Sequence, residues 1–226
     1  MKTETQRWNL AAEEYSKKVE SKNSQGFLIR ENCLNPYLFS ALGNVRGKKI
    51  LDYGCGDGWL ANELKKKGAY AKGCDISDKF IEIARKKYPG IEFDIIKKKT
   101  PYKSNEFEVV VSNIVLHITE DYKNVLNEMY RILKPGGKCI ATMMHPQYYK
   151  EEMINLSKPE EKLEIKVEGS IPVIYYKRNP EIYEKAFKEA GFKIISRVDC
   201  IAKRVINREL RKYSEKPFFL LYELKR

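Results

Sequence analysis

Ile50-Leu51-Asp52-Tyr53-Gly54-Cys55-Gly56-Asp57-Gly58 is the stretch of this 226-residue chain that says most about its fold. A short apolar run ends in a glycine-rich turn, and the apolar residues beyond it, Leu60, Ala61 and Leu64, have helical spacing. The stretch therefore predicts a strand, a tight turn and a helix. Three glycines in five positions permit positive φ angles and close approach of a ligand to the backbone. The N-terminus of the following helix offers N–H groups that the helix itself leaves unpaired.

The turn departs from two common phosphate-binding patterns. A dinucleotide site requires Gly-x-Gly-x-x-Gly, whereas Gly58 stands here at a spacer position and Trp59 replaces the third glycine. A P-loop would continue with Gly-Lys-Ser/Thr, which is missing. Asp52 and Asp57 would place negative charge beside the ligand, which favours a cation over a pyrophosphate.

The segment from Asp52 to Gly58 resembles motif I of the class I S-adenosylmethionine-dependent methyltransferases, and the small-molecule enzymes of methyltransferase type 11 in particular. The resemblance implies S-adenosyl-L-methionine as cofactor and S-adenosyl-L-homocysteine as product. It also implies that Asp52 lies near the methionine part of the cofactor, with Gly54, Cys55 and Gly56 packed beneath it.

A second acidic residue follows at the distance typical of nucleotide-binding α/β folds. Asp75 ends a predicted strand 21 residues after Gly54, and its carboxylate can accept hydrogen bonds from two ribose hydroxyls. The alternative, a helix-capping aspartate, is weaker because Ser77 and Asp78 already supply caps. The resemblance extends to residues 73–77 as motif II, and it implies that Ile76 borders the adenine.

The next strand, residues 91–96, ends differently from its relatives. They usually have an acidic residue near the adenine amino group, where this chain has lysines at 97–99. Asp94 could substitute only if the register shifted. We therefore expect backbone groups near Ile96 and Lys97 to contact the adenine.

Two further segments resemble the same family. Ser112 ends the strand predicted at 107–112 and Asn113 follows it, where the family's chain passes the transferred methyl group. The resemblance implies that both bind the cofactor. The Asn/Asp-Pro-Pro-Tyr/Phe motif of many DNA and RNA amino-methyltransferases is missing there. A helix over 122–133 stops at Leu-Lys-Pro-Gly-Gly, residues 133–137, before a strand over 138–144.

The N-terminal segment is predicted to be helical. Positions 8, 11, 12, 15 and 19 fall on one face of a helix within residues 1–22. The resemblance to small-molecule methyltransferases implies that this segment covers the cofactor and makes Tyr15 a candidate for that role, with plain packing as the alternative. Residues 23–45 are predicted as a second helical region, broken at Asn35-Pro36 with Asn35 as cap and Pro36 as first helical residue.

The C-terminal part combines a hairpin with the end of the core. Alternating apolar residues predict strands on either side of a turn at residues 168–170. Asn179-Pro180 starts a helix that Gly191 closes, and residues 192–199 and 217–224 are predicted as the last two strands.

Together these elements predict a three-layer, doubly wound α/β fold with a seven-stranded, mostly parallel sheet and an antiparallel last strand. Within one domain, we expect an N-terminal helical cap (1–45), a cofactor-binding core (46–145), an insertion over the acceptor pocket (146–178) and the end of the core (179–226).

The two histidines of the chain are the candidates for a general base. His117 and His145 each follow a segment expected at the mouth of the pocket, and imidazole titrates near neutral pH. A structural role for His117 is the alternative. Five scattered cysteines, none in a Cys-x-x-Cys pair, suggest neither a disulfide framework nor a metal site.

Composition indicates the cellular setting. No apolar run approaches the length of a bilayer and no secretory signal is evident, so we expect a cytoplasmic protein without membrane attachment, monomeric or homodimeric. The formal net charge of +12 would suit a nucleic-acid partner, but a lysine-rich solvated surface explains it better.

The sequence therefore predicts methyl transfer to a small-molecule acceptor by in-line displacement. Two other functions stay open, namely methylation of RNA or protein, and nucleotide binding by an oxidoreductase or a non-catalytic protein.

Overall fold

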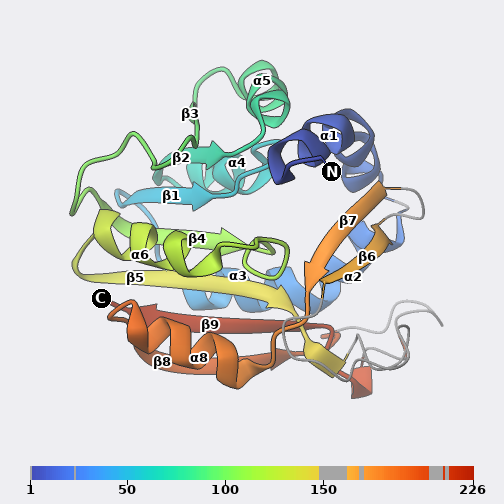
Figure 1. Ribbon diagram of the computed structural model, residues 1–226. Helices are drawn as coiled ribbons and strands as arrows, with labels where there is room; N and C mark the ends of the chain where they lie inside the picture. Colours follow the sequence, from blue (N-terminus) through green and yellow to red (C-terminus); the bar gives the residue numbers. More distant parts are fainter. Residues whose placement is uncertain (1, 23, 148–161, 168–170, 204–210, 212–213) are drawn as a thin grey trace.

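The computed structural model describes residues 2–22, 24–147, 162–167, 171–203, 211 and 214–226. Across these residues, one sheet has seven strands in the order β3-β2-β1-β4-β5-β9-β8 (Figure 1). The strands are β1 (Lys49–Tyr53), β2 (Tyr70–Asp75), β3 (Glu92–Ile95), β4 (Phe107–Asn113), β5 (Leu133–Met144), β8 (Lys193–Cys200) and β9 (Phe219–Lys225).

The strand directions confirm the predicted fold class. The pairs from β3 to β5 are parallel, and β9 runs antiparallel to both β5 and β8. The central strands are apolar and buried on both faces, as at Ile50, Leu51 and Val109–Val111. Such continuous apolar strands are typical of parallel sheets that helices cover on both sides.

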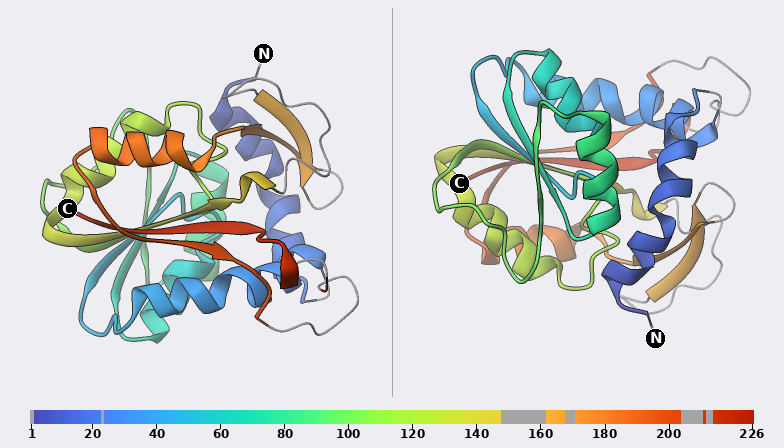
Figure 2. Two further views of the ribbon diagram at one scale, coloured as in Figure 1. Left: turned by 90° about the horizontal axis from the view of Figure 1, so that it is seen from below. Right: turned by 90° about the horizontal axis from the view of Figure 1, so that it is seen from above.

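Helices form the two outer layers (Figure 2). One face packs against α3 and α4, with α5 beside α4, while α6 and α8 cover the other face. Each helix buries one apolar stripe, the arrangement expected of amphipathic helices around a shared core. Their bounds are Asn35–Leu42 for α3, Trp59–Lys66 for α4, Asp78–Lys87 for α5, Tyr122–Ile132 for α6 and Pro180–Glu189 for α8.

Helix α3 does begin at Asn35, with Pro36 in its first turn as expected, but the expected role of Asn35 as a cap is wrong. Helix α2 (Gln25–Ile29) continues through a π-helical turn, η1 (Arg30–Leu34), directly into α3. Asn35 has helical φ and ψ of −57° and −38°, and its side chain bonds Glu31 (2.6 Å) instead of capping a helix. A widened turn ahead of Pro36 accommodates the ring and the missing N–H, so the chain stays helical.

Strand β5 also begins earlier than predicted. It starts at Leu133, which pairs with Phe107, and its register shifts before Val109 pairs with Lys138. The Pro-Gly-Gly step lies at this irregularity, with Gly136 at a φ of 74°. A glycine in the left-handed region permits the bend without ending the strand.

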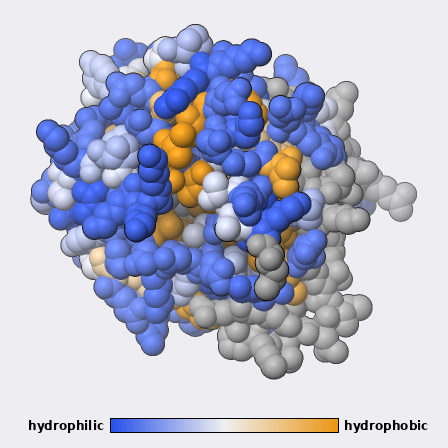
Figure 3. All heavy atoms as spheres, turned by 45° about the horizontal axis from the view of Figure 1, so that its top comes forward, coloured by the Kyte–Doolittle hydropathy of each residue, from blue (hydrophilic) through white to orange (hydrophobic). Residues whose placement is uncertain are grey.

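Two elements lie over the ends of the central strands (Figure 1). Helix α1 (Glu4–Glu20) packs against α5 and against β7. β6 (Lys162–Val167) and β7 (Ile171–Tyr176) form the predicted antiparallel hairpin as a separate sheet, and its turn at 168–170 lies outside the described residues. Figure 3 shows apolar atoms in a furrow of an otherwise largely hydrophilic face.

Candidate functional site

A cavity of roughly 500 Å³ opens at the carboxyl ends of β1, β2 and β4. The strand order reverses between β1 and β4, and in open α/β sheets ligands bind at such a switch point. Ten of the residues expected at the site line this cavity: Tyr15, Asp52, Gly54, Cys55, Gly56, Asp75, Ile76, Ile96, Lys97 and Asn113.

The glycine turn forms the floor of the cavity. The N–H groups of Gly54 and Cys55 both donate to the carbonyl of Cys74, at 2.7 and 2.9 Å, which fastens the turn to β2. A Cβ on Gly54 would lie 2.4 Å from Val115, so the loop after β4 rests directly on the turn. A Cβ on Gly56 would meet no atom within 4 Å, so this residue borders open space that a ligand can enter.

Asp52 is a buried carboxyl group, and one of its two oxygens has no hydrogen-bond partner among the described residues. Its side chain is 1% exposed, and that oxygen is Oδ2. Burial, reinforced by the nearby charges of Asp75 and Asp57, raises the pKa of Asp52 to about 8. A bound cation would reverse this penalty, because it would stabilise the ionised form.

Asp75 is held in place by two backbone amides. Gly56 N–H donates to Oδ2 at 3.0 Å and Ser77 N–H donates to Oδ1 at 2.9 Å. Burial raises the pKa of Asp75 in spite of these bonds. Each oxygen keeps a lone pair, so the carboxylate can still accept bonds from two hydroxyls. Ser77, whose hydroxyl accepts from Phe80 N–H at 3.1 Å, is the N-cap of α5.

Asp94 does not reach the cavity. Its Oδ2 accepts a bond from the Tyr102 hydroxyl at 3.0 Å, whereas Ile96, Lys97 and Lys98 line the wall. The acid at this end of the cavity comes from α6 instead. Glu128 accepts bonds from the N–H (2.9 Å) and hydroxyl (2.6 Å) of Thr100, and it pairs with Arg131.

The Glu128 network ties the loop after β3 to α6. Burial would raise the pKa of Glu128, but the bonds from Arg131 and Thr100 outweigh it and lower the pKa to about 2. No sequence motif marked this residue, because its partner Thr100 is 28 residues away in the chain.

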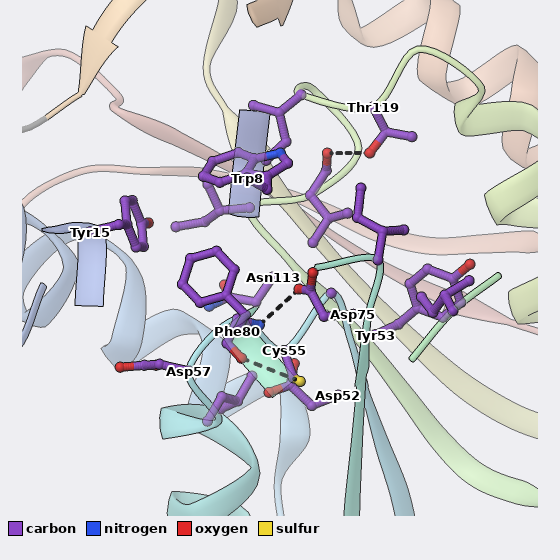
Figure 4. A pocket seen from close by; sticks show the side chains of 18 of the residues that line it. Trp8, Tyr15, Asp52, Tyr53, Cys55, Asp57, Asp75, Phe80, Asn113 and Thr119 are labelled. Carbon is purple, nitrogen blue, oxygen red and sulfur yellow. Dashed lines mark hydrogen bonds between the residues drawn. The ribbon is translucent and has the colours of Figure 1, made fainter. Parts of the chain in front are cut away.

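Helix α1 lies across the cavity through an aromatic cluster (Figure 4). Tyr15 meets Trp8 and Phe80 edge-on with ring centroids 5.9 Å apart in both pairs. Ser16 and Lys87 fasten the same helix to the turn, since both donate to Asp57 Oδ2, at 3.1 and 2.8 Å. Tyr15 therefore both packs and lines the cavity.

The structure brings neither histidine to the cavity, in contrast to the expected position at its mouth. His117 is 1% exposed, packs edge-on against Tyr175 at 4.8 Å, and has no hydrogen-bond partner at either ring nitrogen among the described residues. Burial and the charge of Arg178 lower its pKa to about 3, so the ring is neutral at physiological pH. His145 lies at the end of β5, 3.7 Å from Asp199. Ser112 is fully buried and does not line the cavity.

A second group of lining residues was not expected from the sequence. Glu4, whose pKa burial raises to about 7, lies at one end of α1. The cavity is also lined from α1, the turn after it, α2, η1 and α4, through Val19, Lys22, Phe27, Arg30, Glu31 and Trp59. Within the described ranges, no group of His, Cys, Asp or Glu residues could hold a metal ion.

Comparison with known proteins agrees with these features. The family description "Methyltransferase domain" matches residues 51–141. A "Demethylmenaquinone methyltransferase" of Chlorobaculum tepidum is 41% identical over 98 residues, which are 42% of this chain and 40% of that protein. A second protein of that name, from Lactococcus lactis, is 37% identical over 116 residues, 46% of each chain. The matches thus span less than half the length of these relatives.

Solved structures share the fold over most of the chain. An S-adenosylmethionine-dependent methyltransferase from Mesorhizobium loti superposes with a TM-score of 0.69 at 24% identity, covering 84% of this chain and 96% of that one. The PH0226 protein of Pyrococcus horikoshii superposes with a TM-score of 0.70 at 22% identity, covering 94% of this chain and 98% of that one.

The residues of the cavity fit S-adenosyl-L-methionine, the cofactor of this family. Asp52 supplies an uncompensated carboxyl for a cation, Gly56 leaves space beside the backbone, and Asp75 can accept two hydroxyl bonds. The carboxyl of Asp52 suits the positively charged part of the molecule, and the carboxylate of Asp75 suits the two ribose hydroxyls. The space beside Gly56 lets the molecule lie against the backbone. Residues 51–141 of this chain therefore match the methyltransferase domain family, and the described fold is the one found in S-adenosylmethionine-dependent methyltransferases.

Proposed function

We propose that this protein transfers a methyl group from S-adenosyl-L-methionine to a small-molecule acceptor. One observation carries the proposal: the cavity that begins at the glycine turn continues beneath α1 to Phe27, Arg30 and Trp59. These residues add a partly aromatic wall to the same cavity, besides the residues that fit the cofactor.

Methyl transfer depends more on how the acceptor and the methyl group are placed than on a covalent intermediate with the protein. The cofactor supplies an electrophilic methyl group on a sulfonium. Gly54 and Gly56 set the floor and Asp75 the ribose position, while α1 covers the site and keeps water out. Alignment of the acceptor with the breaking bond gives most of the rate gain in such a displacement. Neither histidine faces the cavity, so we do not assign the removal of an acceptor proton to them.

A ring-shaped acceptor such as a quinone is the candidate we favour. The Chlorobaculum and Lactococcus relatives carry the name demethylmenaquinone methyltransferase. Aromatic and aliphatic walls at Val19, Phe27 and Trp59 suit a flat apolar ring. The proposal concerns the class of acceptor, since the matched region is under half of those proteins.

Product formation tests the proposal directly. Purified protein would be incubated with S-adenosyl-L-methionine and demethylmenaquinone, in oxidised and reduced form, and S-adenosyl-L-homocysteine would be measured by mass spectrometry. We expect product that depends on the acceptor, and its loss in Asp75→Ala. Product at the acceptor-free rate in every reaction would contradict methylation of this class.

The net charge of +12 supports RNA as a second class of acceptor. Binding to bulk RNA that weakens steeply with salt would favour it, because released counterions dominate such binding. We expect affinity too weak to measure at 0.15 M salt in a filter assay, and a micromolar Kd there would instead support RNA.

A cofactor-binding protein without transferase activity is the third possibility. A protein of this fold named the [4+2]-cyclase SpnF superposes with a TM-score of 0.58 at 17% identity, so the fold also carries other chemistry. Cofactor binding without product for any acceptor would support this class.

The division of the chain and its oligomeric state are also proposals. We propose the four-part division given above, with the hairpin as part of the cover, and a monomer or homodimer. Among the described helices, none has both the length and the apolar character needed to cross a bilayer.

A further inference from the structure

Thr142 on β5 lies next to Asn113, the last residue of β4, in the register of the two parallel strands. Thr142 is fully buried, whereas Asn113 lines the cavity. The Thr142 hydroxyl oxygen lies 2.7 Å from Asn113 Oδ1 and 3.0 Å from the backbone nitrogen of Ile114. One buried hydroxyl thus contacts two consecutive residues of the cavity wall.

The protons of this cluster determine how the amide of Asn113 is oriented. The N–H of Ile114 can only donate, so the Thr142 oxygen accepts from it. Asn113 Oδ1 is the one acceptor that the described residues offer to the buried hydroxyl proton of Thr142. The amide oxygen on that side pairs this proton, whereas the reversed amide would leave it without an acceptor. Nδ2 is therefore the amide atom that can donate a hydrogen bond to a molecule bound in the cavity. No described residue accepts a bond from it.

The same threonine holds a strained residue. Ile114 has a φ of 61°, and its N–H also donates to the Thr142 carbonyl at 3.0 Å. A β-branched residue in this left-handed region is a genuine outlier and costs on the order of 1–3 kcal/mol. Such strain persists where surrounding contacts impose it, and it concentrates at functional sites.

We propose that Thr142 is a positioning residue that fixes Asn113 with Nδ2 toward the cavity, as a hydrogen-bond donor to an oxygen of a bound molecule. Two molecules offer that chemistry, the carboxylate of the cofactor's amino-acid end and an oxygen of the methyl acceptor. The proposal rests on the proposed function only for the second of these.

The orientation can be tested without any acceptor. The side-chain NH₂ signals of Asn113 in a ¹H–¹⁵N spectrum would be identified by their loss in Asn113→Asp. Thr142→Val removes the hydroxyl at nearly constant shape, and Thr142→Ser keeps it. We expect the NH₂ pair to shift or double in Thr142→Val and to stay in place in Thr142→Ser. Ser196→Ala, a hydroxyl removal on the outer strand β8, should leave the pair unchanged.

Ligand titrations then identify the partner. If it is the cofactor's carboxylate, Thr142→Val should raise the Kd of S-adenosyl-L-homocysteine about tenfold, the effect of roughly one hydrogen bond to a charged group. The Kd of 5′-methylthioadenosine, which lacks the amino-acid end, should not change. If it is the acceptor, Thr142→Val should leave the S-adenosyl-L-homocysteine Kd unchanged and lower kcat/KM for the acceptor, with recovery in Thr142→Ser.

Two results would overturn the proposal. One is an NH₂ pair in folded Thr142→Val that coincides with that of the wild type. The other is a pair that moves while cofactor affinity and kcat/KM both keep their wild-type values.

Discussion

Gly54 and Gly56 have similar backbone angles and different surroundings, which makes them a matched pair of residues. Their φ values are 76° and 51°, so alanine is strained at both positions. Only at Gly54 would the new Cβ meet a neighbour, Val115, at 2.4 Å. We expect Gly56→Ala to lower the free energy of unfolding by about 1–2 kcal/mol and Gly54→Ala by about 1–3 kcal/mol more.

Urea unfolding of the two glycine variants measures this difference, with S-adenosyl-L-homocysteine affinity as a second readout. Val115→Ala should restore part of the loss in the Gly54→Ala background. Equal losses in the two single variants would show that the loop after β4 does not rest on the turn as described.

The carboxyl of Asp52 predicts a particular dependence of stability on pH. Its pKa is raised in the folded protein, so its contribution to stability is complete below the unfolded value of about 4 and is lost as the pH rises through about 8. Asp52→Asn removes that loss, so its Tm should fall less than that of the wild type between pH 5 and pH 9. Differential scanning fluorimetry measures it, with the exposed Asp121→Asn as control. Parallel Tm curves for wild type and Asp52→Asn would contradict the argument.

Among structural elements, the loop after β4 is anchored by a buried arginine. Arg178 is 3% exposed, and its guanidinium donates to the carbonyls of Leu116 (2.8 Å), Thr119 (3.0 Å) and Glu120 (3.2 Å). The rings of Tyr122 and Tyr176 lie 3.9 and 4.7 Å from its central carbon. Since Val115, Ile118 and Thr119 line the cavity, the end of the β6–β7 hairpin fixes one cavity wall.

We therefore expect Arg178→Gln to lower the free energy of unfolding by about 3 kcal/mol, because one buried and two partly buried carbonyls lose a charged donor. Cofactor affinity should fall in the variant at temperatures where it is still folded. Arg197→Gln is the control, since Arg197 is 43% exposed and its ion pairs should contribute under about 1 kcal/mol. Similar losses for the two variants in urea unfolding would remove Arg178 from this role.

Helix α1 is fastened to the turn by a second small cluster. Lys87 Nζ donates to Asp57 at 2.8 Å and to Ser16 at 2.6 Å. The side chain of Lys87 is 24% exposed and that of Asp57 is 14% exposed. Lys87→Ala should increase hydrogen exchange in α1 several-fold, because a partly buried ion pair is lost. Lys79→Ala removes an exposed pair with Glu82 and should leave the exchange of α1 unchanged. The same protection in both variants would mean that Lys87 does not hold the helix.

The elements of the fold were predictable to different degrees for physical reasons. The strand–turn–helix unit and the β6–β7 hairpin are local, since their glycine spacing and alternation depend on neighbouring residues. The π-helical turn before Pro36 has no such signal, because it arises from how the helix packs around the proline. Boundaries such as the start of β5 depend on pairing with a distant strand.

The sequence predicted the site residues that lie at strand ends. It missed most of the site residues that lie on helices. Asp52 and Asp75 lie at the carboxyl ends of two parallel strands, so their meeting at one edge of the sheet follows from the topology. His117 lies in the loop after β4 and packs into the core against Tyr175, which its sequence neighbours do not reveal. Glu128 and Arg30 reach the cavity from helices whose placement only the folded chain defines.

For the whole molecule, one cavity bounded by the sheet, α1 and the loop after β4 accounts for the motifs together. Its floor is glycine, its wall carries buried acids, and its cover carries aromatic rings. The central claim is that this cavity binds the sulfonium nucleotide of its family. Isothermal titration of the full chain with S-adenosyl-L-homocysteine tests it, with NAD as comparison. We predict one-to-one binding with a Kd in the micromolar range or below and no heat with NAD. Saturable NAD binding, or no S-adenosyl-L-homocysteine binding up to millimolar concentration, would contradict it.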